Sequence, residues 1–283
     1  MYYIQETDKP NKLFEFFNII KLEDDKIILP ISKEKISFEK SKKLAVKTKR
    51  ILDKTYCNKV IISNKIERQE QYMNFLYSYN LNIVDGIWLF EVLSEKILDY
   101  IIVKKSLKKE QIQLSILVND LSEIILEEIK ILVKQYKIIN IVTNHIEKFK
   151  KIEENLLANE GIVITVTNNK RKSLTKSELI LNVDFPTELI NEYKIYENAV
   201  IVNIKNTVKI KEKRFNGICV NDYEIKFRDN INSDYDCEKI AKYKNKYIYE
   251  SEIYKNQPTK NILKKIDADK VKITKLIANN ITF

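Results

Sequence analysis

Side chains that could bind a small anion are concentrated in the stretch Thr167 to Ser173, which reads Thr-Asn-Asn-Lys-Arg-Lys-Ser. Three adjacent cations with several amide and hydroxyl donors suit a phosphate or a carboxylate. The competing interpretation is a solvated surface loop. Under the binding interpretation the contacts come from Thr167, Asn168, Asn169, Lys170 and Arg171.

Few residues of the chain could act as a nucleophile or a general base. His145 is the only histidine, and the three cysteines, Cys57, Cys219 and Cys237, are far apart. A Ser-His-Asp or Cys-His arrangement would have to use His145, which we interpret as a helix-capping or surface residue. No C-x-x-C pair is present, so we expect reduced thiols, no metal site and no disulfide framework.

The formal net charge of +10 raises the possibility of nucleic-acid binding, because clustered cations gain affinity for phosphates by releasing counterions. Arginine, however, occupies only positions 50, 68, 171, 214 and 228, and the other 45 of the 50 basic residues are lysine. Arginine is the residue that forks onto phosphates and base edges. Its scarcity argues against a dedicated nucleic-acid-binding protein.

Composition and apolar patterning place the chain among cytoplasmic globular proteins. With 283 residues, 44% of them hydrophobic, it can build one large domain or two ordinary ones. Apolar runs such as Ile138 to Val142 are far shorter than the roughly 20 residues that cross a bilayer. Met1 to Pro10 lacks the basic start and apolar stretch of a secretory signal. We therefore expect a cytoplasmic protein that makes no membrane contact.

Hydrophobic periodicity predicts a small α/β domain over residues 1–108. Short strands and a brief helix are expected in the first 40 residues. They are followed by a helix at 41–54, a strand at 60–63, a helix at 70–79, a strand at 82–84 and a helix at 88–103. The Lys-rich cluster at 104–109 then interrupts the apolar pattern, and we place the domain boundary there.

Residues 109–228 are predicted to form a parallel-sheet domain. Strand 112–118, helix 121–136 and strand 138–143 make a βαβ unit, whose crossover is expected to be right-handed. Helix 146–159 stops at Gly161, where a C-terminal glycine cap belongs. Runs rich in Ile and Val follow at 162–167, 179–183 and 199–204, as is typical of strands buried on both faces.

The remainder of the chain is predicted to end in a helical tail. Alternating pieces at 208–211 and 217–220 suggest a hairpin or edge strands. Residues 229–283 are expected to form a C-terminal segment rich in tyrosine, with a helix over 261–279. Such a tail commonly packs back on an N-terminal domain.

Two stretches resemble a known family. Ile-Ile-Asn-Ile-Val-Thr-Asn at 138–144, with the helix residues 147–152, resembles the second strand and helix of the NAD(P) domain of shikimate dehydrogenases and their glutamyl-tRNA reductase relatives. Ser-Glu-Leu-Ile-Leu-Asn at 177–182 is similar to a further strand of that family. The resemblance covers residues 111–226. It implies an α/β fold in which a small N-terminal domain precedes a Rossmann-like sheet and a C-terminal helix folds back.

The resemblance also implies catalysis by a Lys and an Asp near the domain cleft. Lys65 and Asp85 are eligible by position alone, and a surface lysine and a turn aspartate are the simpler interpretation. Asp184, which ends the strand at 179–183, is interpreted as a turn residue before Pro186.

The phosphate-binding turn departs from the family pattern. In the family, glycines let backbone amides approach the pyrophosphate, whereas residues 118–123 read Val-Asn-Asp-Leu-Ser-Glu. Carboxylates at Asp120 and Glu123 would face an anionic ligand. If a ligand binds here, the contacts come from Asn119, Asp120, Ser122, Thr143 and Asn144. Neither NAD nor NADP is favoured, because residues 143–145 supply neither an arginine for a 2′-phosphate nor an acid for a ribose hydroxyl.

These observations favour a non-catalytic small-ligand-binding or regulatory protein on a degenerate dinucleotide-binding fold. Its partner would be a small anion or another protein. One alternative is an NAD(P)-dependent oxidoreductase of the shikimate dehydrogenase type, with the stretch 167–173 holding the phosphate. The other is a Lys-rich nucleic-acid-binding protein, whose binding would be lost steeply as salt rises.

Overall fold

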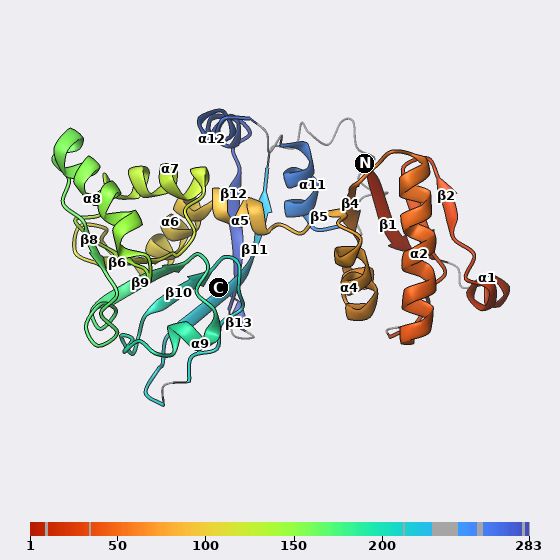
Figure 1. Cartoon of the computed structure of the whole chain (residues 1–283), viewed down its shortest axis with the longest axis horizontal. Helices are drawn as coiled ribbons and strands as arrows, with labels where there is room; N and C mark the ends of the chain where they lie inside the picture. Colours follow the sequence, from red (N-terminus) through yellow and green to blue (C-terminus); the bar gives the residue numbers. More distant parts are fainter. Residues whose placement is uncertain are drawn as a thin grey trace. The chain divides into compact units, whose positions relative to one another are not determined.

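The chain consists of two compact units, each built around a mostly parallel sheet (Figure 1). The computed structural model describes residues 1–8, 11–33, 35–211, 213–227, 243–253, 257–278 and 281–282. Unit 1 comprises Met1–Gly86 and Arg228–Tyr254, and unit 2 comprises Ile87–Phe227 and Lys255–Phe283. The predicted α/β class is confirmed.

The division between the units differs from the boundary expected at residues 104–109. The chain passes from unit 1 to unit 2 after Gly86, returns after Phe227 and leaves again after Tyr254. The Lys-rich cluster instead ends helix α6 (Ser94–Lys105), whose C-cap Ser106 has a φ of 52°. Cations in a last helical turn complement the helix dipole, so the cluster marks a helix end inside unit 2.

Unit 1 contains a five-stranded sheet in the order β2-β3-β1-β4-β5. The last four strands are mutually parallel, and β2 is an antiparallel edge strand. The strands are β1 (Tyr2–Glu6), β2 (Lys21–Glu23), β3 (Lys26–Leu29), β4 (Lys59–Ile62) and β5 (Asn82–Val84). The helices are α1 (Lys12–Phe17), α2 (Phe38–Lys54), α3 (Asn64–Glu67), α4 (Glu70–Ser78) and α11 (Asn245–Glu252).

Helices cover both faces of the unit 1 sheet. Ile4 and Val60 join the core formed with Leu44 of α2 and Leu76 of α4. Neighbouring residues of a strand point to opposite faces, and on the other face Tyr3 meets Tyr243 with ring centroids 5.1 Å apart. Helix α11 contacts β4 and β5. Part of the C-terminal segment therefore belongs to unit 1.

Unit 2 contains an eight-stranded sheet in the order β13-β12-β11-β10-β9-β6-β7-β8. The strands from β6 to β11 are mutually parallel, and numbered along the chain they follow the order 3-2-1-4-5-6 of dinucleotide-binding sheets. They are β6 (Gln113–Leu117), β7 (Ile138–Val142), β8 (Thr165–Thr167), β9 (Ser177–Asn182), β10 (Val200–Asn203) and β11 (Ile218–Lys226). The Rossmann-like architecture predicted for this part of the chain is confirmed.

The helices of unit 2 largely follow the predicted pattern. They are α5 (Ile87–Val92), α6, α7 (Glu123–Leu132), α8 (Ile146–Glu160), α9 (Thr187–Ile190) and α12 (Thr259–Ala268). Gly161 ends α8 with a φ of 66°, as its predicted role as a cap requires. The single helix expected at 88–103 is divided at Leu93 into α5 and α6.

Three predicted elements are wrong in part. The strand expected at 162–167 is shortened to β8, because residues 162–164 form an irregular connection after the Gly161 cap. Residues 208–211 form no strand, and β11 pairs in parallel with β10 instead of forming a hairpin. The helix expected at 261–279 ends at Ala268 and gives way to β12 (Lys272–Ala278), which pairs antiparallel with β11.

The end of α12 has a local explanation. Lys270 adopts a φ of 51°, which ends the helical path. Beyond it Val271, Ile273 and Leu276 are buried while Lys272 and Thr274 are exposed, so the alternation of a strand takes over. β13 (Ile281–Thr282) pairs with β12 at the sheet edge.

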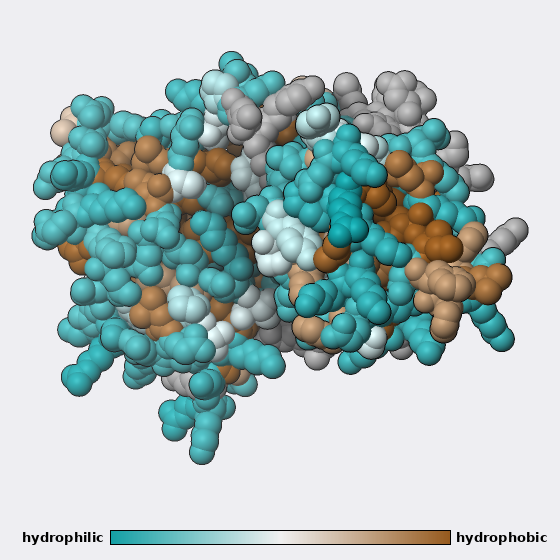
Figure 2. All heavy atoms as spheres, turned by 45° about the vertical axis from the view of Figure 1, so that its right-hand side comes forward, coloured by the Kyte–Doolittle hydropathy of each residue, from teal (hydrophilic) through white to brown (hydrophobic). Residues whose placement is uncertain are grey.

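The surface agrees with the charged composition of the chain. Most of the face in Figure 2 is hydrophilic, with brown apolar areas between charged side chains. On α1 no residue is buried, and Leu13, Phe16 and Phe17 are exposed. Among the described residues, no helix has both the length and the apolar character that a bilayer-crossing segment needs.

Candidate functional site

The loops that follow β6 and β9 are neighbours in the centre of the unit 2 sheet, because these two strands pair with each other. From β6 the chain proceeds to β7 on one side, and from β9 to β10 on the other. Open α/β sheets bind ligands at such a reversal, outside the carboxyl ends of the strands. The turn at 118–123 and Asp184 therefore occupy the place where a dinucleotide-binding sheet holds phosphate.

The carboxylate of Asp184 accepts the backbone N–H groups of this turn. The Asn119 N–H donates to Oδ1 at 2.9 Å and to Oδ2 at 3.1 Å, and the Asp120 N–H donates to Oδ2 at 2.7 Å. Backbone amides of this loop are the groups that would bind a ligand phosphate. The sequence interpretation of Asp184 as a turn residue missed this role, and nothing local in the sequence signals it.

The Ser122 hydroxyl both accepts and donates a hydrogen bond. Its Oγ accepts the N–H of Ile125 at 3.1 Å and so caps α7. It also donates to Oε1 of Glu91, a carboxylate from α5 that is only 6% exposed. The ammonium of Lys205 lies 3.9 Å from the other oxygen of Glu91. The N-terminus of α7 thus has its own cap and a resident carboxylate beside that cap.

Asn119, Thr143 and Asn144, three of the candidate ligand contacts, are brought together by hydrogen bonds. Oδ1 of Asn119 accepts the N–H of Asn144 at 2.9 Å and the hydroxyl of Thr143 at 3.4 Å. The Thr143 hydroxyl oxygen also accepts the N–H of His145 at 3.0 Å. These bonds tie the end of β6 to the end of β7. These three residues are therefore grouped, and the Asn119 side-chain oxygen is occupied by groups of the other two.

A chain of side-chain amides runs from the ends of β9 and β10 to Asn221, which lies within β11. Nδ2 of Asn182 donates to Oδ1 of Asn203 at 2.9 Å, and Nδ2 of Asn203 donates to Oδ1 of Asn221 at 2.9 Å. Asn182 also bonds the backbone of Phe185 in both directions. Asn182 and Asn203 are almost fully buried. Sequence reasoning missed Asn203 and Asn221; an Asn ending two successive Ile- and Val-rich strands was the available signal.

The stretch 167–173 does not stay at this edge of the sheet. Because β8 and β9 are parallel, the chain must return from the carboxyl end of β8 to the amino end of β9. The carbonyl of Ser173 accordingly accepts bonds from Gln113, the first residue of β6, at 3.4 Å and from Asn140 at 3.3 Å. The expectation that the whole stretch lies at the ligand-binding edge is therefore wrong beyond its first residues.

Local bonds shape this stretch into a series of turns. Thr167 Oγ1 accepts the N–H of Asn169 at 3.1 Å, and Oδ1 of Asn169 accepts the N–H groups of Arg171 and Lys172 at 3.0 and 3.1 Å. Lys170 forms an ion pair with Glu192, which raises the pKa of the lysine. Asn168 and Arg171 are exposed. The predicted anion contacts are thus divided between two places in unit 2.

The other candidates for chemistry lie outside this group. Lys65, in unit 1, donates its ammonium to the Ser32 carbonyl at 3.1 Å, and Asp85 precedes the turn at Gly86, whose φ is 78°. His145 is exposed and begins α8 without a side-chain cap bond. Cys57 is a free thiol, Cys219 is buried in β11, and Cys237 lies outside the described residues. In the part of the chain that the structure describes, no cluster of His, Cys, Asp and Glu could hold a metal ion.

Glu128 of α7 is the most perturbed carboxyl near the site. It is 1% exposed, and one oxygen accepts the N–H of Glu95 at 3.2 Å while Oε1 has no partner among the described residues. Burial, and then the nearby Glu95 carboxylate, raise the pKa of Glu128 to about 8. This side chain therefore holds a proton near neutral pH, beneath the N-terminal turn of α6.

No protein-family model matches the chain, and no curated protein matches it. Among solved structures, the chain is similar to L-tryptophan dehydrogenase from Nostoc punctiforme, with 10% identity over 95% of this chain and 80% of that one and a TM-score of 0.33. It is also similar to ornithine carbamoyltransferase from Pyrococcus furiosus, with 10% identity over 75% and 73% of the two chains and a TM-score of 0.27. Aspartate transcarbamoylase from Trypanosoma cruzi gives 11% identity over 74% of each chain and a TM-score of 0.28. No function is carried over at this level of similarity.

Proposed function

We propose that this chain acts by binding and not by catalysis, and that its Rossmann-like unit 2 holds no dinucleotide at the point where the strand order reverses. The observation that carries the proposal is the carboxylate of Asp184 on the amides of Asn119 and Asp120. In this view an internal anion has replaced the ligand phosphate. The fold is retained and its cofactor is not.

Electrostatics supports the proposal. Two unit charges 4 Å apart repel by about 4 kcal/mol at an effective dielectric constant of 20. One hydrogen bond to a charged group contributes only about 1.5–3 kcal/mol. A pyrophosphate would therefore have to displace Asp184 from its amides or accept its repulsion. Glu91 beside Ser122, and the exposed Asp120 and Glu123, add negative charge on the same side.

The oxidoreductase alternative needs a phosphate-binding site elsewhere, which the stretch 167–173 was expected to supply. Its cations leave the ligand-binding edge with the returning chain, and Lys170 is paired with Glu192. A small ligand or a protein partner that does not use the α7 N-terminus is compatible with this geometry. We therefore keep binding without hydride transfer as the proposed function.

Thermal denaturation of the full chain with NAD, NADH, NADP and NADPH tests this proposal. A ligand at 100 times its Kd stabilises a fold by roughly 2.7 kcal/mol, and each kcal/mol moves the Tm by about 2–4 °C for a chain of this class. We expect no such shift with any of the four. Asp184→Ala is the informative variant, and Asp120→Ala, which changes an exposed carboxylate of the same turn, is its control.

The outcomes separate the hypotheses. A dinucleotide shift in the wild-type chain that disappears on changing Lys170, Arg171 and Lys172 to Ala would support the oxidoreductase and overturn the proposal. A short RNA is added as a fifth ligand, and a shift produced by it alone, and lost as salt rises, would favour the nucleic-acid alternative. A dinucleotide shift confined to Asp184→Ala would support the proposal, because it would show that the internal carboxylate blocks the site.

A further inference from the structure

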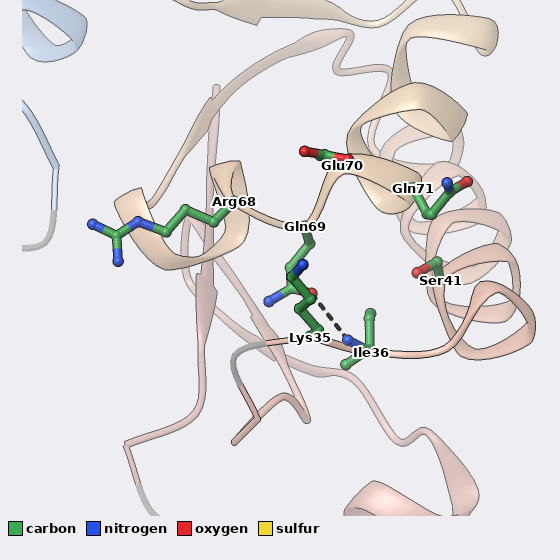
Figure 3. Close-up of a pocket in the computed structure, with 7 residues that line it drawn as sticks. All are labelled: Lys35, Ile36, Ser41, Arg68, Gln69, Glu70 and Gln71. Carbon is green, nitrogen blue, oxygen red and sulfur yellow. Dashed lines mark hydrogen bonds between the residues drawn. The ribbon is translucent and has the colours of Figure 1, made fainter. Parts of the chain in front are cut away.

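Unit 1 contains a cavity of about 90 Å³ at the carboxyl edge of its own sheet. Its walls come from the loop between β3 and α2, from the first turn of α2, and from the junction of α3 and α4. Figure 3 shows the lining residues Lys35, Ile36, Ser41, Arg68, Gln69, Glu70 and Gln71. The space admits several water molecules, and it is well below the roughly 300 Å³ of the smallest drug-sized pockets. Any ligand must therefore be small.

The N-terminus of α4 opens into this cavity without a side-chain cap. Gln69 stands at the N-cap position and makes no capping bond. Its Oε1 instead accepts the N–H of Ile36 at 3.2 Å, the bond drawn as a dashed line in Figure 3. Among the described residues, the first-turn amides of this nine-residue helix therefore have no side-chain acceptor. Such amides, with the positive end of the helix dipole, favour an anion.

Ser41 provides the second and independent sign of a ligand. The side chain is fully buried, and its Oγ has no hydrogen-bond partner among the described residues. In Figure 3 the hydroxyl points from α2 toward the side of the cavity where Gln69 lies. A buried hydroxyl without a partner is costly. A polar occupant of the cavity would remove that cost.

The charges around the cavity limit what it can hold. Lys35 lines the wall and is exposed, so its ammonium can reach an occupant. The Arg68 guanidinium extends away from the other lining side chains (Figure 3). Glu70 also lines the wall, and its carboxylate would repel a second negative group. The site therefore suits one compact anion rather than a polyphosphate.

We propose that this cavity binds a single small oxyanion, held by the first-turn amides of α4, the Ser41 hydroxyl and the Lys35 ammonium. The chemistry is that of inorganic phosphate or of the phosphate of a small phosphomonoester. This inference concerns unit 1 alone and goes beyond the function proposed for unit 2. Dinucleotide binding in unit 2 would overturn that function and leave this inference standing.

Nuclear magnetic resonance of the isotope-labelled full chain tests the inference at single residues. Potassium phosphate and, separately, glycerol phosphate are titrated at constant ionic strength, with sodium chloride as the reference. We expect saturable movement of the backbone amide signals of Gln71 and Tyr72. Saturation by inorganic phosphate alone would identify the free anion as ligand, and saturation by both would identify a phosphomonoester.

Variants separate a built site from general attraction to a basic surface. Ser41→Ala should weaken phosphate binding by about tenfold, the effect of losing one hydrogen bond to a charged ligand. Lys35→Ala, which alters only an exposed side chain, should weaken it by a similar factor. Lys43→Ala on the exposed side of α2 is the matched control and should leave the Kd unchanged.

Three results would overturn the inference. The Gln71 and Tyr72 signals could fail to move with either phosphate, or move equally with chloride. The variants Ser41→Ala and Lys35→Ala could both bind phosphate as the wild-type chain does. Should Ser41→Ala fold poorly, Lys35→Ala alone decides, because its side chain contributes to no core.

Discussion

Asp184 accepts the backbone N–H of Asn119, 65 residues away in the sequence, on both carboxylate oxygens, at 2.9 and 3.1 Å. The bond joins the end of β9 to the end of β6 at the place where the strand order reverses. A charged acceptor on backbone amides makes a strong bond. The contact therefore contributes to the stability of unit 2.

Replacing the Asp184 carboxylate by an amide should destabilise unit 2. In Asp184→Asn one acceptor oxygen becomes a donor, so a turn amide loses its partner. We expect a loss of about 1–3 kcal/mol in the free energy of unfolding, measured with urea. Asp120→Asn, at an exposed position of the same turn, should change it by less than about 0.5 kcal/mol. Equal effects of both variants would contradict the role given to Asp184.

Glu128 should make stability depend on pH. Its pKa is raised from 4.5 to about 8 by burial, so between these values the folded chain binds more protons than the unfolded chain. The contribution of Glu128 to stability is therefore present below pH 4.5 and is lost as pH rises through 8. Within that window the slope is at most about 1.4 kcal/mol per pH unit.

Urea denaturation from pH 5 to pH 9 measures this dependence. Glu128→Gln keeps an acceptor for the Glu95 N–H and cannot ionise, so its stability should decline less with rising pH than that of the wild-type chain. Glu123→Gln, in the exposed first turn of the same helix, serves as the control. A wild-type curve parallel to that of Glu128→Gln would show that Glu128 does not carry the effect.

Removing the central residue of the amide chain, Asn203, should destabilise unit 2 more than removing its end at Asn221. Asn203→Ala removes the acceptor of Asn182, in a buried bond, and the donor to Asn221, in a partly buried one. We expect a loss of about 2–3 kcal/mol in the free energy of unfolding. Asn221→Ala, at the less buried end, should cost less. A larger loss of stability at Asn221 would show that burial does not determine the contribution of each amide.

Two glycines should respond differently to a methyl group. A Cβ on Gly217 would lie 2.1 Å from the Ala199 carbonyl oxygen, so Gly217→Ala must push β11 away from β10. At Gly161 no atom lies within 4 Å, and only the φ of 66° opposes a side chain. We expect Gly161→Ala to cost about 1–2 kcal/mol and Gly217→Ala clearly more. Thermal denaturation of both variants ranks them, and the reverse order would contradict this account.

Local signals in the sequence predicted the elements well. The strand at 82–84 coincides with β5, and the helix that ends before Gly161 is α8. In both places the periodicity and the terminating residue agree, so neighbours along the chain decide the structure. The Ile- and Val-rich strands were recognisable for the same reason, and with them the Rossmann-like class.

Contacts between distant residues were not predictable in the same way. The strand β12 follows a Lys-rich helix pattern and becomes a strand because β11 offers it an edge. The boundary at Gly86 has no charge or composition signal, because α5 continues directly after it. The bond from Asp184 to Asn119 depends on a strand pairing that sets the order of the sheet. Each of these three features depends on tertiary contacts, which cannot be identified from the local sequence.

The return of α11 to unit 1 delays the completion of that unit during synthesis. Domains generally fold as units, beginning from the N-terminal one as it is made. Here the residues up to Gly86 are made first, but the sheet face at β4 and β5 gains its covering helix only after all of 87–227 has been translated. A nascent chain therefore carries an open apolar face through most of its synthesis. Proteins truncated before α11 should be substrates for chaperones rather than smaller versions of the folded molecule.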